Sequence, residues 1–390
     1  MIPPKGGNGV DKGHLDLAVT LRRELHRHPE LACREIWTKG HLIEFLRLHS
    51  SLEIVDRGPW FYALYRAGKD RPGIAFRADF DALPMDETID LPYGSQFPGV
   101  AHKCGHDGHS ACLAAFALEV DKYGADKNIY FVFQHGEETV EGAKDCAPLM
   151  DEEGIGEVFA YHNVPGMPLN SIAVMDGIAS CGSTGMIITL TGIPAHASQP
   201  EDGRNPCFAI AEVIRSIPAF IDPAQYRGLV LGTIIGVNAG KEAFGMSASE
   251  GRLMLTIRSQ FDEELEELRQ RIEGKAREEA GKYGLECNFS FRDSVPALLN
   301  HCESAGKVRR AAKSLGFSLL EVGAPARGSE DFAWFTRRTR GAMFWVGAGE
   351  GRAPIHTAEF DFNDEIIPAV VDMYRALADE PPSESPGPRR

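Results

Sequence analysis

The order of strand-like and helix-like segments constrains the fold of this chain more than any other sequence feature. Before residue 183, apolar strand-like runs alternate with helical patterns, among them the strand at 73–84, the helix at 110–124 and the strand at 128–138. Alternation of this kind predicts an α/β layer with a mixed, mainly parallel sheet flanked by helices. Polar residues repeatedly follow these strands, where open α/β sheets bind ligands.

The order of elements changes near residue 183. Segment 183–292 reads β-α-β-β-α-β, which is the ferredoxin-like α+β pattern. The elements after it are expected to return to the first layer. The sequence therefore predicts a discontinuous α/β domain made of 1–182 and 293–390, with a smaller inserted domain at 183–292. The Pro- and Ser-rich tail, 378–390, is expected to be disordered.

Composition excludes several classes of function. A net charge of -15 over 390 residues, without a dense basic cluster, argues against a nucleic-acid partner. The chain has no run of about 18 apolar residues, so we predict no membrane span. The first residues lack the apolar core of a secretory signal. The eight cysteines form no dense framework, so we expect free thiols in a reducing cytoplasm. All except Cys104 are expected to be small buried residues.

Among the residues of HKCGHDGH with metal-binding chemistry, we single out Cys104, His106 and His109. Thiolate and imidazole are ligands that borderline divalent metals prefer, and neighbouring glycines allow the backbone to place them closely. No metal-spacing rule is met outright, so a lone cysteine among structural loop histidines is an equally good interpretation of this segment alone.

Two adjacent carboxylates, Glu137 and Glu138, shift that balance towards a metal site. They follow an apolar strand, and in extended backbone adjacent side chains point to opposite faces. One carboxylate can then bind a metal while the other reaches the water on that metal, as hydrolysis requires. A solvated turn is the alternative. His162, at the end of the next strand, and His356, in a late loop, complete the constellation.

Asp79 and Asp81 lie two residues apart after a buried strand, which places them on one face. A carboxylate there can orient a metal-bound histidine from behind. An Asp-capped turn before Pro84 explains the pair equally well.

The sequence as a whole resembles the M20 metallopeptidase and aminoacylase family, in its branch of N-acyl amino acid, hippurate and auxin-conjugate hydrolases. The matching segments run in order from residue 21 to about 365: LRRELHRHPEL, FRADFDALPMDE, HKCGHDGHSACLAAF, VFQHGEETVEGA, AHASQPEDGRNP, GRLMLTIRS, GSEDFAWF and PIHTAEFDFNDE. The resemblance implies hydrolysis of a small amide, a catalytic domain, and an inserted domain that acts as lid and dimer interface.

The resemblance also implies roles for single residues. Five match metal ligands of a two-metal centre: Cys104, His106, Glu138, His162 and His356. Ligand softness favours Zn for a site with cysteine, whereas Mn and Co tolerate mixed histidine and carboxylate sites. Glu137 matches the general base. His196 matches a residue that binds the carbonyl oxygen in the neighbouring subunit of a homodimer, although a loop histidine is its ordinary interpretation. Arg258 matches a residue near the substrate's carboxylate, and a solvated strand arginine is weighed equally.

Two departures from the family pattern bear on the substrate. Gln134-His135-Gly136 stands where Gln-Pro-Ala is common, and Gly245-Met246-Ser247-Ala248 replaces an Asn-Val-Ile-Pro run whose Asn contacts substrate. The acyl or amino-acid preference is therefore left open. A dipeptidase or carboxypeptidase on the same scaffold and a non-catalytic metal or peptide binder are the alternatives. A serine nucleophile is weaker, because the chain has no G-x-S-x-G elbow.

Overall fold

The computed structural model describes residues 9–381 and divides the chain into two compact units. The first unit comprises Met1–Ala179, Leu299–Ala324 and Asp331–Arg390, and the second comprises Ser180–Leu298 and Pro325–Glu330. The second unit extends beyond the predicted 183–292 at both ends and gains a short later segment. Of the tail expected to be disordered, the first two residues end a helix at Asp379, and 382–390 lie outside the described residues.

The first unit is built on an eight-stranded sheet, in the order β1-β2-β4-β3-β5-β14-β6-β13. Its strands are β1 (Glu53–Asp56), β2 (Phe61–Tyr65), β3 (Gly73–Asp79), β4 (Asn128–Gln134), β5 (Ile155–Val164), β6 (Ile172–Ala173), β13 (Leu319–Leu320) and β14 (Arg340–Gly347). The central strands β4, β3, β5 and β14 are parallel, whereas β1 and β2 add an antiparallel edge. Because parallel strands share a direction, their carboxyl ends meet at one edge of the sheet.

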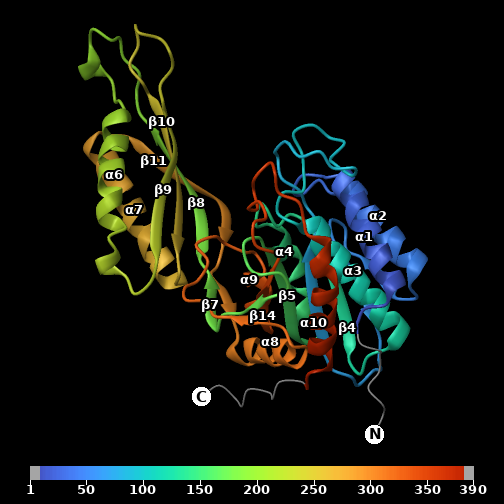
Figure 1. Ribbon diagram of the computed structural model, residues 1–390. Helices are drawn as coiled ribbons and strands as arrows, with labels where there is room; N and C mark the ends of the chain where they lie inside the picture. The colour runs from blue at the N-terminus through green and yellow to red at the C-terminus, as the bar shows by residue number, and fades with distance from the viewer. Residues whose placement is uncertain (1–8, 382–390) are drawn as a thin grey trace. The chain divides into compact units, whose positions relative to one another are not determined.

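Helices cover the sheet of the first unit (Figure 1). They are α1 (Lys12–Arg27), α2 (Ile36–His49), α3 (His106–Tyr123), α4 (Gly142–Cys146), α5 (Leu149–Glu152), α8 (Cys302–Ser314), α9 (Ala333–Thr336) and α10 (Ile367–Asp379). Apolar residues of α1, α2, α3, α8 and α10 form one core with the strands, while α4 and α9 contact β4 and β14. Nearly every residue of β3 and β4 is buried, as expected for strands covered on both faces. The predicted mixed, mainly parallel sheet flanked by helices is confirmed.

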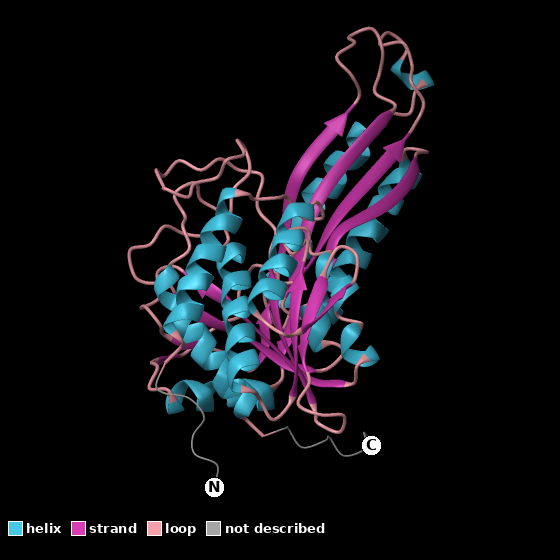
Figure 2. Ribbon diagram, turned by 90° about the vertical axis from the view of Figure 1, so that its right-hand side faces the viewer, coloured by secondary structure: helices cyan, strands magenta, loops and turns pink. Residues whose placement is uncertain are grey.

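The second unit has the ferredoxin-like order of elements that the sequence predicts. Its elements are β8 (Gly182–Thr191), α6 (Cys207–Phe220), β9 (Val230–Ala239), β10 (Glu250–Ser259), α7 (Asp262–Lys282) and β11 (Glu286–Val295). The strands of this unit form one antiparallel sheet (Figure 2), and their order is β11-β8-β10-β9. Alternate residues of β8 and β10 are buried in one apolar core with α6 and α7, so the helices cover one face of the sheet.

Several short elements have no counterpart in the predicted pattern. They are the paired strands β7 (Gly177–Ser180) and β12 (Leu298–Asn300) and the 3-10 helices η1 (Pro200–Asp202), η2 (Pro223–Gln225) and η3 (Asp364–Ile366). None of the described helices is both long enough and apolar enough to cross a membrane.

The cysteine predictions are partly right. All eight thiols are free, as expected. The expectation that every cysteine except Cys104 is buried is wrong, because Cys33, Cys207 and Cys302 are exposed and Cys104 itself is buried. Cys207 and Cys302 each begin a helix, α6 and α8, where the first turn faces solvent.

The aromatic cluster around Phe76 on β3 gives a test of this fold. The Phe76 ring is fully buried, with ring centroids of Phe116 and Tyr374 at 4.9 and 4.8 Å. We expect Phe76→Ala to lower the free energy of unfolding by about 3–5 kcal/mol, because it leaves a cavity in a packed core. Chemical denaturation measures the loss. The control Ile36→Ala, at a residue 81% exposed, should change stability by less than about 0.5 kcal/mol, and equal effects would contradict the assigned core.

Candidate metal centre

The loop that carries Cys104 and His106 leads directly into α3, which begins at His106 and not at the later start that its apolar pattern suggested. Gly105 between them has a φ of +111°, and a Cβ there would lie 2.3 Å from Asn163 Oδ1. Only glycine fits this position. The two potential ligands are therefore held by a backbone shape that the sequence HKCGHDGH specifies locally.

Six of the residues singled out in the sequence come together at the carboxyl ends of β3, β4 and β5. They form three overlapping groups whose potential ligand atoms lie within 4.8 Å of one another: Cys104, His106 and His162; Cys104, Glu138 and His356; His106, Glu137 and Glu138. His162 lies on β5, and His356 lies in a loop before α10. The groups share members, so thiolate, imidazole and carboxylate atoms converge on one place.

Glu137 and Glu138 lie in a turn after β4, so the expectation of an extended backbone is wrong. Two carboxylates fix the backbone of this turn: Asp81 Oδ2 accepts the Glu138 N–H at 2.9 Å, and Glu35 Oε1 accepts the Gly136 N–H at 2.8 Å. Both glutamates still face the site: Glu137 Oε2 and Glu138 Oε1 each lie 3.8 Å from His106 Nε2.

Hydrogen bonds orient the histidines so that Nε2 faces the cluster. The Nδ1 atom of His106 bonds to Asp81 Oδ1 at 3.0 Å, and that of His162 bonds to the Asn163 carbonyl at 2.8 Å. His106 Nε2 and Glu138 Oε1 are buried and form no hydrogen bond within the described part of the chain. Buried polar atoms without partners are costly, and a divalent cation would satisfy both. The residues present therefore fit a divalent metal ion.

Burial disfavours the charged forms of three members of the cluster. Burial raises the pKa of Glu138 to about 7 and raises the pKa of the Cys104 thiol well above its usual value. Burial also lowers the pKa of His162 to about 3, so its imidazole is neutral and able to bind a metal. A bound cation stabilises the carboxylate and thiolate that burial alone disfavours.

A buried polar network lies behind the cluster. His109 Nδ1 bonds to Asp79 Oδ1 and His109 Nε2 to Asn163 Oδ1, each at 2.6 Å. Arg77 then joins Asp79 to Asp331 with contacts of 2.6 and 2.7 Å. Both ring nitrogens of His109 form hydrogen bonds within this network, so His109 supports the residues of the cluster. Arg77 and Asp331 were not predicted, although both lie in segments that carry the family resemblance.

A second network, also not predicted, fixes the start of α3. His26 on α1 bonds through Nδ1 to Asp107 Oδ2 and through Nε2 to Glu87 Oε1, both at 2.8 Å. Lys103 Nζ contacts the same Glu87 oxygen and donates to the Phe360 carbonyl. His26 lies in the segment LRRELHRHPEL and Glu87 lies in PMDE. These segments of the family resemblance were the sequence signal that could have indicated the network.

Two predicted residues, His196 and Arg258, lie in the second unit. His196 is exposed, with its Nδ1 2.7 Å from Ser198 Oγ, and it pairs with Met246 in a short antiparallel bridge. The segment that departs from the family pattern therefore lies directly beside His196. Arg258 on β10 donates from Nη1 to Ser329 Oγ at 2.7 Å.

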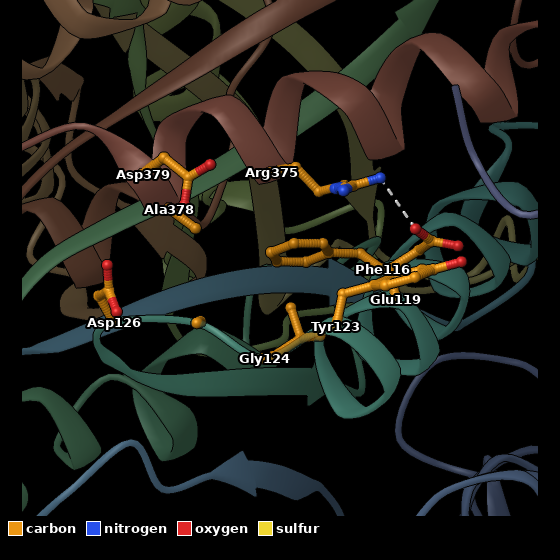
Figure 3. A pocket seen from close by; sticks show the side chains of 10 residues that line it. Phe116, Glu119, Tyr123, Gly124, Asp126, Arg375, Ala378 and Asp379 are labelled. Carbon is orange, nitrogen blue, oxygen red and sulfur yellow. Dashed lines mark hydrogen bonds and ion pairs between the residues drawn. The ribbon is translucent and has the colours of Figure 1, made fainter. Parts of the chain in front are cut away.

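A separate small cavity in the first unit contains none of the predicted site residues. It has a volume of about 60 Å³ and lies beside α3 and α10, where Arg375 donates to Glu119 Oε2 at 2.9 Å (Figure 3). This volume holds only a few water molecules, so the cavity is too small for an organic substrate.

Comparison with known proteins supports the family resemblance. The sequence profile of peptidase family M20/M25/M40 matches residues 75–380, more than half of the chain. N-acetylcysteine deacetylase of Bacillus subtilis (strain 168) is 26% identical over 95% of this chain and 98% of its own length. The crystal structure of the Bacillus subtilis YXEP protein, described as a dinuclear metal-binding peptidase from the M20 family, superposes with a TM-score of 0.80 at 25% identity, covering 94% of this chain and 98% of that chain.

The His26 network predicts a pH dependence of stability. Burial alone would lower the pKa of His26, but Asp107 and Glu87 raise it to about 9. The folded protein therefore holds a proton that the unfolded chain releases near pH 6.5, and this stabilisation is present below pH 6.5 and lost as the pH rises towards 9. Between these values the melting temperature of the wild type should fall more steeply than that of His26→Gln, by an amount equivalent to about 1–3 kcal/mol.

The control for this measurement is His41→Gln, because His41 pairs with Glu24 at the surface. It should keep the wild-type slope. Identical slopes for the wild type and His26→Gln would show that His26 is not held charged by its two carboxylates.

Proposed function

This chain belongs to peptidase family M20/M25/M40, and from that premise we propose that it hydrolyses the amide bond of small N-acyl amino acids. The coarser statement, a metal-dependent hydrolase of the amidohydrolase and peptidase type, follows from the family and the relatives. One observation carries the proposal: a cluster suited to divalent metal has a second carboxylate, Glu137, beside the one expected to bind metal. The similarity to an N-acetylcysteine deacetylase favours an N-acyl amino acid.

We propose that two divalent ions are held by the five residues that match the family's ligands: Cys104, His106, Glu138, His162 and His356. A bound divalent ion supplies Lewis acidity and lowers the pKa of a coordinated water. The cysteine favours Zn(II), and the histidine and carboxylate ligands also suit Mn(II) or Co(II).

Glu137 is the proposed general base. Its side chain is 10% exposed and reaches the same histidine atom as Glu138, so it lies beside the ligands rather than in solvent. In this role Glu137 takes the proton of the attacking water and returns it to the leaving amine. Asp81 keeps His106 and the Glu138 turn in place while the proton moves.

We further propose that the second unit acts as a lid and joins two copies of the chain, so that His196 acts on the carbonyl oxygen in the partner subunit. Strand β9 supports this role, since it is an edge strand of its sheet and carries three exposed apolar residues, Ile234, Ile235 and Val237. Exposed apolar sheet edges favour pairing with another chain.

A substrate panel tests the reaction class. Metal-free protein is supplied with Mn(II), Co(II) or Zn(II) and assayed on N-acetyl amino acids, N-benzoyl amino acids and dipeptides. The proposal predicts turnover of N-acyl amino acids above that of dipeptides. The reverse preference would make the chain a dipeptidase or carboxypeptidase, and no hydrolysis of any member would indicate a non-catalytic binder.

Glu137→Gln should lower kcat by about 10²–10⁴-fold, the usual contribution of a positioned general base. Its metal content, measured by elemental analysis, should equal that of the wild type. Glu141→Gln, an exposed change in the same loop, is the control and should keep full activity. Retained activity in Glu137→Gln would remove this residue from the role of base.

Cys104→Ala should lower the amount of bound metal per chain, because it removes the thiolate shared by two of the ligand groups. Elemental analysis after dialysis measures the loss, with the exposed Cys302→Ala as control. Unchanged metal content in Cys104→Ala would exclude Cys104 from the centre.

Subunit complementation tests the role of His196. Glu137→Gln and His196→Ala should each be inactive alone. After mixing under conditions of subunit exchange, half of the dimers are mixed and each has one intact site, so about a quarter of wild-type activity should return. No recovery, despite proven exchange, would show that His196 does not act across a dimer.

A further inference from the structure

His356 is the least supported of the three histidines proposed as metal ligands. The rings of His106 and His162 are each fixed by a hydrogen bond at Nδ1, whereas the ring of His356 forms no hydrogen bond with any residue between 9 and 381. The His356 side chain is 51% exposed, and its Nε2 atom lies 3.6 Å from Glu138 Oε1. The position of this ligand therefore depends on its backbone.

The backbone of His356 has an uncommon conformation. Its φ is +60°, in the left-handed region that residues other than glycine seldom adopt. A residue stays in such a conformation only when the contacts around it fix the chain. Contacts from outside the loop are therefore expected to hold His356 in place.

Lys103 makes two such contacts, one at each end of the segment 356–360. Its carbonyl accepts the His356 N–H at 2.6 Å, and its ammonium donates to the Phe360 carbonyl at 2.8 Å. Lys103 also precedes Cys104 in the chain, so the residue that fixes His356 is bonded covalently to another proposed ligand. Cys104, Glu138 and His356 together form one of the ligand groups of the cluster.

The ammonium of Lys103 is itself fixed in position. Lys103 is completely buried, and its Nζ atom contacts Glu87 Oε1 at 2.5 Å as well as the Phe360 carbonyl. A buried ammonium without partners would be strongly disfavoured, so this atom remains between the carboxylate and the loop. A lysine side chain held at its far end in this way restricts the movement of the loop that it contacts.

We propose that Lys103 is a positioning residue for the metal centre, which holds the loop of His356 against the segment of Cys104 before a metal ion binds. It acts through His356 and contacts neither metal nor substrate. This inference rests on the proposed function, in which Cys104 and His356 are ligands of a two-ion centre. Without Lys103, binding of an ion to His356 also has to order the loop, so that ion is held more weakly.

Metal binding by Lys103→Met tests the inference without any substrate. Methionine has nearly the length of lysine but neither its charge nor its hydrogen-bond donor. In equilibrium dialysis against Co(II) with elemental analysis, one of the two ions should bind about 10–100-fold more weakly than in the wild type, the range expected for residues that orient metal ligands. The other ion should bind as in the wild type. Equal affinities for both ions in the two proteins would overturn the inference.

Lys307→Met is the matched control, because it makes the same substitution in another buried ion pair. Lys307 is 2% exposed and pairs with Glu157 near the start of β5, whereas the cluster lies at the carboxyl ends of the strands. This variant should bind both ions as the wild type does. An equal loss of affinity in Lys307→Met would attribute the effect to a general loss of stability and would also overturn the inference.

A double variant tests whether Lys103 acts through His356. Adding Lys103→Met to His356→Ala should weaken metal binding no further than His356→Ala does alone, because the ligand that Lys103 positions is already absent. Additive losses would show that Lys103 acts elsewhere, which would contradict the proposed role.

Hydrogen exchange of the metal-free wild type keeps the inference testable if Lys103→Met does not fold. The His356 amide, which donates to the Lys103 carbonyl, should exchange at least about 100-fold more slowly than in the unfolded chain. Exchange at the rate of the unfolded chain would show that the loop is not held before metal binds, and would overturn the inference. A wild type that binds both ions and hydrolyses no N-acyl amino acid would contradict the proposed function alone, and the binding and exchange measurements would then decide the role of Lys103.

Discussion

The candidate centre depends on one carboxylate, Asp81, which holds two parts of the site at once. Its Oδ1 atom fixes the ring of His106, and its Oδ2 atom accepts the backbone N–H of Glu138. A histidine at the start of α3 and a glutamate in the turn after β4 are thereby placed against each other. Asp81 itself follows β3, so the parallel order of β3 and β4 is what brings these groups to the same edge of the sheet.

Such an arrangement of buried charge is stable only when every member is paired. Arg77 and Asp79 lie on β3 itself and would be costly inside a sheet covered on both faces. Asp331 compensates by accepting from Arg77 and from Gln134 on β4, and by accepting the Ala143 N–H of α4. The network thus joins the strands to α4 and to the late part of the chain. We infer that its role is to keep the metal-binding edge rigid.

The sequence predicts the fold well because periodicity and element order are local properties. The switch at residue 183 and the ferredoxin-like order after it need no knowledge of tertiary contacts. At Glu137 and Glu138 the sequence favours extended backbone over a turn, because the apolar run before them gives no sign of where the strand ends. Tertiary hydrogen bonds to Glu35 and Asp81 shape the turn that the structure has there.

The support of the site could not be predicted in the same way. Partners such as Arg77 and Asp331, or His26 and Asp107, are far apart along the chain, and only folding shows that they meet. The family resemblance named the potential ligands, and the structure brings six of the residues together in one cluster. The resemblance did not assign the residues that orient the ligands.

Metal titration combined with rate measurement tests the central claim most directly. Metal-free protein is titrated with Zn(II), Mn(II) or Co(II), and bound metal and the rate of N-acyl amino acid hydrolysis are measured in the same samples. The account predicts that the rate rises with bound metal and stops rising when the cluster is filled. Hydrolysis that is independent of bound metal, or saturated binding without hydrolysis of any amide, would contradict it.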